Sequence, residues 1–115
     1  MMKNKDHTNV FLIINSQVYP LLSEVVTIGR KFSNDIVINN ELISRDHAVI
    51  KQEGDQFMIY DLQSTGGSFV NNKRVERCVI YSGDIISLAG IQIMFVNNSP
   101  RLRKNEIAVT KSLQS

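Results

Sequence analysis

The stretch from His47 to Tyr60 reads HAVIKQEGDQFMIY and holds two short apolar runs separated by a turn signal. Both runs are rich in Val, Ile and Phe, which favour strands. Between the runs, Glu53-Gly54-Asp55 has the composition of a hairpin turn. The stretch therefore predicts two antiparallel strands joined by a short connection.

Similar strand-sized runs lie on both sides of this hairpin. They are VFLII at 10–14, VVTI at 25–28, DIVI at 35–38, SFV at 68–70, DIISL at 84–88 and IQIMFV at 91–96. Turn-forming pairs such as Asn71-Asn72 and Ala89-Gly90 separate them. Nothing before residue 100 has the periodicity of a long helix. Because each strand must bury an apolar face, we expect an all-β fold with two antiparallel sheets packed as a β-sandwich.

The composition of the 115 residues suits one ordinary globular domain, with 43% hydrophobic and 21% charged residues. No apolar run approaches the roughly 20 residues that span a bilayer, and the opening MMKNKDHTN has no signal-peptide core. We therefore expect a cytoplasmic protein without a membrane segment. The net charge of +2 is too small to indicate a nucleic-acid binder, although RLRK at 101–104 keeps that alternative open.

The folded domain is expected to cover residues 10–97, with a flexible N-terminal segment at 1–9 and a tail or linker at 98–115. The lone Cys78 excludes an internal disulfide and is expected to be a buried small hydrophobe. With two histidines and one cysteine, the chain cannot assemble an ordinary structural zinc site, and we expect no metal or cofactor.

A polar cluster, Ser44-Arg45-Asp46-His47, stands between apolar runs in LISRDHAVI at 42–50. A serine and a histidine so close together suggest a hydrolase. In an extended junction, however, side chains three residues apart lie about 10 Å from each other, whereas a nucleophile and its base need about 3 Å. We therefore expect no catalytic residues and no enzyme. His47 is expected to be a buried ring that is hydrogen-bonded to a loop backbone.

The same cluster suits phosphate binding better. A phosphorylated side chain carries a charge of about −1.5 to −2 and is held by convergent arginine, hydroxyl and backbone N–H donors. STGGS at 64–68 resembles a phosphate nest but lacks the lysine and the helix of a nucleotide P-loop, which argues against ATP. Donors of the required kinds are Arg30, Ser44, Arg45, Thr65 and the backbone of Gly66-Gly67.

Several motifs in order resemble a forkhead-associated (FHA) domain: IGR at 28–30, SRDHA at 44–48, DLQSTGGSFVNNKRV at 61–75 and SGDIISL at 82–88. The resemblance covers roughly residues 10–97. It implies an FHA/SMAD-like antiparallel β-sandwich that recognises phosphothreonine in a partner protein during signal transduction. It also implies a Ser/Thr kinase that phosphorylates this partner. The chain would be a freestanding module or the N-terminal sensor of a larger protein.

The resemblance assigns roles to individual residues. Arg30 and Ser44 would bind the phosphate, and Arg45 would touch the phosphate or the peptide backbone. Ser64 and Thr65 would close the site. Four residues would support the binding loops, namely Gly29, His47, Gly67 and Asn71.

Gly66 departs from the family pattern, which usually has an asparagine that clasps the peptide backbone. Its loss removes hydrogen bonds worth about 0.5 to 1.5 kcal/mol each, so we expect weaker binding. The departure keeps an alternative open, a phosphate-independent interaction or dimerisation domain. Thr8 and Thr110, in the two terminal segments, leave open self-association between copies.

Overall fold

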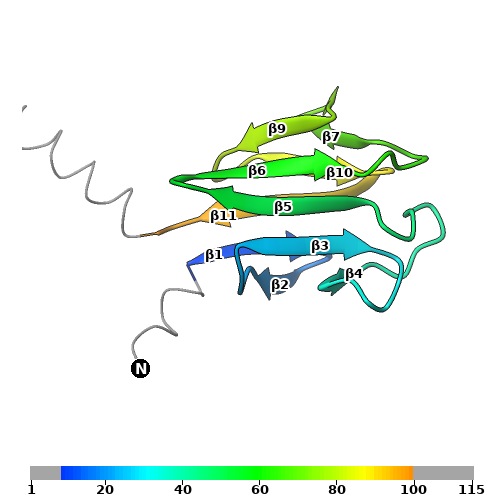
Figure 1. Cartoon of the computed structure of the whole chain (residues 1–115), viewed down its shortest axis with the longest axis horizontal. Coiled ribbons are helices and arrows are strands. Elements are labelled where there is room, and N and C mark those ends of the chain that lie inside the picture. The colour runs from blue at the N-terminus through cyan, green and yellow to red at the C-terminus, as the bar shows by residue number, and fades with distance from the viewer. Residues whose placement is uncertain (1–8, 100–115) are drawn as a thin grey trace, which may run out of the picture.

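The computed structural model describes residues 9–99, and within this range the chain forms two sheets packed face to face (Figure 1). The predicted all-β sandwich is thus confirmed. None of the described residues belongs to a helix that could span a bilayer. The predicted terminal segments lie mostly outside the described residues, as do Thr8, Thr110 and the RLRK stretch.

The larger sheet has six strands in the order β2-β1-β11-β10-β7-β8. Their bounds are β1 Val10–Ile14, β2 Gln17–Pro20, β7 Ser68–Val70, β8 Lys73–Arg74, β10 Ile85–Leu88 and β11 Ile91–Asn97. All neighbours in this sheet are antiparallel.

The smaller sheet has five strands in the order β4-β3-β5-β6-β9. Their bounds are β3 Val25–Gly29, β4 Ile36–Val37, β5 Ala48–Glu53, β6 Gln56–Asp61 and β9 Arg77–Ile80. Strands β5 and β6 form the hairpin expected from the 47–60 stretch, with Glu53 paired to Gln56. The pairing of β3 with β4 is parallel, a feature that the sequence did not predict.

The core fills the space between the sheets because alternate residues of each strand point inward. On β1, Val10, Leu12 and Ile14 are buried while Phe11 and Ile13 are half-buried on the outer face. Aromatic packing adds to the core, since the Phe57 and Phe95 ring centroids lie 5.4 Å apart. Cys78 is only half-buried against this core and carries a free thiol.

Two-residue turns fix the register of three hairpins. Asn71 and Asn72 have φ of 49° and 70°, and Ala89 and Gly90 have φ of 50° and 92°. Positive φ at both positions is the geometry of the type I′ turn, whose twist matches that of the flanking strands. The turn predicted at Asn71-Asn72 is therefore confirmed, and a third such turn joins β1 to β2.

The ends of the sandwich differ in what they carry. In Figure 1, β1 begins and β11 ends at the left of the molecule, and Asn98 N donates to Asn9 O there. The connections β3–β4, β4–β5, β6–β7 and β10–β11 gather at the right. The predicted phosphate-binding segments, Gly29-Arg30, 44–47 and 64–67, lie at this second end.

Candidate functional site

A pocket of about 560 Å³ opens where these connections meet. It is lined by five of the predicted binding residues, which come from three separate connections: Arg30, Ser44, Arg45, Thr65 and Gly66. The remaining lining residues are Glu41, Leu42, Ile43 and Ala89, and of these sequence reasoning missed Ala89 as a site residue. The fold thus brings together residues that are up to 59 positions apart, since Arg30 and Ala89 share the pocket.

Arg30 follows β3 and is held by the neighbouring loop at two points. Its backbone N–H donates to Ser44 O at 3.1 Å, and its Nε donates to Ile43 O at 3.0 Å. Within residues 9–99, neither Arg30 nor Arg45 forms an ion pair with a carboxylate. The remaining guanidinium N–H groups of Arg30 can therefore bind an anion in a fixed orientation.

Ser44 connects two of the loops. Its Oγ accepts a hydrogen bond from Thr65 N at 3.0 Å. Because the hydroxyl acts as acceptor in this contact, its own proton stays available to donate to a ligand. The Thr65 side chain is exposed at the same place.

His47 is fully buried and contacts both loops, as predicted. Ser44 N donates to its Nδ1 at 3.1 Å, and its Nε2 lies 2.9 Å from Gly67 O. Since Nδ1 accepts from an amide, the ring proton is on Nε2, which donates to the carbonyl. The junction is bent here rather than extended, so the expected separation of about 10 Å was wrong. Both ring nitrogens are nevertheless occupied by backbone groups, so His47 has no nitrogen left to serve Ser44 as a base.

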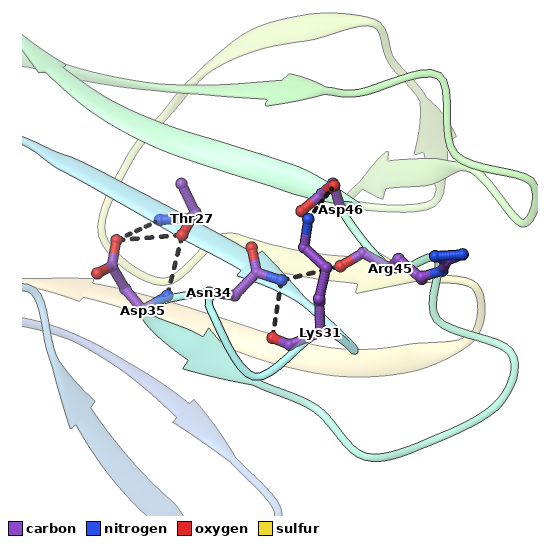
Figure 2. A network of polar contacts seen from close by, with 6 residues as sticks. All are labelled: Thr27, Lys31, Asn34, Asp35, Arg45 and Asp46. Carbon is purple, nitrogen blue, oxygen red and sulfur yellow. Dashed lines mark hydrogen bonds and ion pairs between the residues drawn. The ribbon is translucent and has the colours of Figure 1, made fainter.

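The loop after β3 is tied to the loop before β5 by Asn34 (Figure 2). Its side chain is 8% exposed, and Nδ2 donates to Lys31 O at 3.0 Å and Arg45 O at 2.8 Å. Lys31 Nζ also pairs with Asp46 at 3.1 Å on the surface. These contacts join the backbone of Lys31 to that of Arg45, which lines the pocket.

Gly29 lies where two loops approach each other closely, and its φ is not positive. A Cβ at this position would lie 2.2 Å from Arg45 O, so glycine is needed for the close approach of two loops.

Asp61 organises the β6–β7 loop. One carboxylate oxygen accepts from Ser64 Oγ and Ser68 Oγ, both at 2.6 Å, and the other accepts from Ser64 N at 3.1 Å. Burial raises the pKa of Asp61, but these hydrogen bonds together lower it below its ordinary value. The carboxylate is therefore charged at neutral pH and holds the loop in shape.

Ser64 and Asn71 lie outside the pocket, as do Gly29, His47 and Gly67. Ser64 is 8% exposed, does not line the pocket, and accepts from Gly67 N through its Oγ at 3.0 Å. Asn71 sits at the opposite end of β7 from Gly67, where its side chain bonds Asp84 and Ile85 N. Both residues shape the β6–β8 region without facing a ligand in the pocket.

A family model of the FHA domain matches residues 26–89, which include all nine residues that line the pocket. The chain belongs to the FHA family. FHA domains are interaction modules, and relatives of this one include regulators.

Three comparisons illustrate the relationship. The FHA chain is 36% identical over 84 residues to the transcriptional regulatory protein EmbR of Mycobacterium tuberculosis, covering 72% of this chain and 22% of EmbR. It is 32% identical over 76 residues to the oxoglutarate dehydrogenase inhibitor of Corynebacterium jeikeium, covering 66% of this chain and 53% of that protein. The structure of EmbR of M. tuberculosis in complex with a low-affinity phosphopeptide superimposes with a TM-score of 0.76 at 28% identity, covering 85% of this chain and 29% of that one. This chain therefore matches only part of each of these longer proteins.

Proposed function

We propose that residues 10–97 form a non-enzymatic module that recognises phosphothreonine in a partner protein. The observation that carries this proposal is the pocket shared by Arg30, Ser44 and Thr65. Three kinds of donor that a phosphate group requires converge there: an arginine that pairs with no carboxylate of residues 9–99, a hydroxyl proton and exposed loop backbone. The phosphopeptide bound to the related EmbR supports the same interpretation.

Arg45 and Thr65 complete the proposed contacts. Arg45 lines the pocket with an exposed side chain and would add a second positive charge near the phosphate. A preference for phosphothreonine over phosphoserine depends on one methyl group, and an apolar niche for a methyl group gives about tenfold discrimination or more. The partner would be phosphorylated by a Ser/Thr kinase, and the module would act in signalling, on its own or within a longer regulator.

Calorimetric titration tests the proposal with three versions of one peptide. The phosphothreonine version should bind, the phosphoserine version should bind about tenfold more weakly, and the unphosphorylated version should not bind. Equal binding of all three versions would contradict the proposal.

A second candidate function is phosphate-independent association through the outer face of the larger sheet. Cross-strand pairs on this face are apolar across four strands: Phe11 with Pro20 and Val96, Ile13 with Val18 and Met94, and Ile85 with Met94. None of these side chains is charged, and Val18 and Met94 are 59% and 38% exposed. Contiguous exposed apolar surface of this kind is typical of protein interfaces.

A further inference from the structure

Gly66 lies in the pocket beside Thr65, where a neighbouring residue leaves no room for a side chain. A Cβ at position 66 would lie 2.5 Å from Ala89 Cβ and 3.1 Å from Ala89 Cα. Gly66 does not have a positive φ, so its backbone conformation is open to other residues. The obstacle to a side chain is therefore Ala89.

Ala89 occupies an unusual conformation for a residue with a side chain. Its φ of 50° lies in the left-handed region, which disfavours any residue with a Cβ relative to glycine. Strain of this kind is often found at functional positions. Ala89 N donates to Gly67 O at 3.0 Å, the same oxygen that His47 Nε2 approaches at 2.9 Å. The Ala89 methyl group is thus held against Gly66 by the contacts that order the pocket.

The pocket has an apolar side next to its cationic side. Leu42 lines the pocket with 62% of its surface exposed, and its carbonyl oxygen lies 3.5 Å from the position of a Gly66 Cβ. With Ala89, it offers an aliphatic surface beside the hydroxyls and guanidinium groups. Glu41 also lines the pocket, so an acidic ligand side chain would meet a like charge as well as lose water.

We propose that Ala89 is a specificity-determining residue, which forms with Leu42 an apolar subsite for an aliphatic side chain near the phosphothreonine. This inference rests on the proposed function and narrows the ligand class. Phosphothreonine peptides with Val, Ile or Leu in the neighbouring sequence are selected over those with Asp or Glu. The Ala89 methyl group occupies the space that a side chain at position 66 would need.

The ligand preference is tested with a phosphothreonine peptide library that is degenerate at the positions around the phosphothreonine. The unmodified chain should retain peptides with an aliphatic neighbour. In titrations with the selected peptide, Ala89→Gly should weaken binding by about fourfold, the factor for burial of one methyl group, while phosphorylation remains required. Leu42→Ala should also weaken binding. The matched control Leu62→Ala, which removes a 41% exposed leucine outside the pocket, should not.

The steric relationship is tested by thermal unfolding, which does not depend on a ligand. Gly66→Ala should lower Tm by at least about 4 °C because it overpacks the contact with Ala89. The same change in an Ala89→Gly background should lower Tm much less. Equal effects of Gly66→Ala in the two backgrounds would overturn the inference.

The binding results distinguish failure of the apolar subsite from failure of the proposed function. If the unmodified chain bound phosphothreonine peptides without any preference for aliphatic neighbours, the subsite would be refuted and the proposed function would stand. If it bound no phosphothreonine peptide, the proposed function would be refuted and the subsite with it.

Discussion

His47 contacts both loops that border the pocket, through Ser44 N on one side and Gly67 O on the other. Replacing it with alanine removes the acceptor of Ser44 N and leaves Gly67 O with only the hydrogen bond from Ala89 N. A buried polar group left without a partner costs about 1 to 3 kcal/mol. We expect His47→Ala to reduce the free energy of unfolding by about 2 kcal/mol or more, as measured by urea titration. It should also weaken phosphopeptide binding, although His47 does not line the pocket.

The neighbouring exposed residue provides the control for this prediction. Asp46→Ala removes a surface ion pair with Lys31, whose side chains are 47% and 52% exposed, and should change stability by less than about 1 kcal/mol. Equal stability of the His47→Ala variant and the unmodified chain would show that the ring does not hold the loops.

Single residues also show what the sequence could and could not predict. His47 was predictable because a polar residue that leads into Ala48-Val49-Ile50 must satisfy its ring nitrogens in the core. The role of Asn34 was not predictable, because its side chain donates to Arg45 O, eleven positions away, and no local pattern reveals this contact. Ala89 was predicted only as part of a turn. Its contact with Gly66 depends on how two hairpins pack.

Among the elements, the β6–β7 loop depends on the charge of Asp61. The pKa of Asp61 is lower in the folded chain than its ordinary value, so its contribution to stability is present above about pH 4 and is lost as pH falls below this. Hydrogen bonds to a charged group are worth about 1.5 to 3 kcal/mol. We therefore expect Asp61→Asn to lower the free energy of unfolding at pH 7 and to have a smaller effect at pH 3.

Chemical unfolding at both pH values provides the measurement. Glu24→Gln, at an exposed residue just before β3, serves as the comparison for removing a carboxylate elsewhere. The Asp61→Asn variant and the unmodified chain should differ less in free energy of unfolding at pH 3 than at pH 7. An equal difference at both pH values would show that the charge of Asp61 does not stabilise the loop.

The elements themselves were predictable where the apolar pattern is long enough. β1 and β7 have the predicted bounds, and β3, β5, β6, β10 and β11 differ from them by at most three residues. Three strands were not predicted because they lack a clear apolar pattern. β8 consists of two charged residues, β2 ends in Pro20, and β9 begins with an exposed arginine. The hydrogen bonds of neighbouring strands, which define these three strands, are not visible in a local pattern.

At the scale of the whole molecule, the proposed phosphopeptide pocket and the apolar sheet face are separate surfaces. If the sheet face joins two copies, sedimentation should show a concentration-dependent dimer, and Met94→Lys should shift it to monomer by placing a charge in the interface. Gln92→Lys, on the same strand and face but outside the apolar pairs, is the matched control. A monomer at all concentrations would rule out dimerisation through this face. Phosphopeptide affinity should be unchanged in either variant.

If Arg30 binds the phosphate group in the pocket, the Arg30→Ala variant should bind a phosphothreonine peptide more weakly than the unmodified chain does. The affinity of both chains for this peptide is the measurement. Removing one partner of such a charge pair costs about 2 to 5 kcal/mol, so binding should be lost or weakened by more than about tenfold. Arg77→Ala, which removes an exposed arginine that does not line this pocket, should bind as the unmodified chain does. Equal affinities of the Arg30→Ala and Arg77→Ala variants would show that Arg30 does not bind the phosphate group.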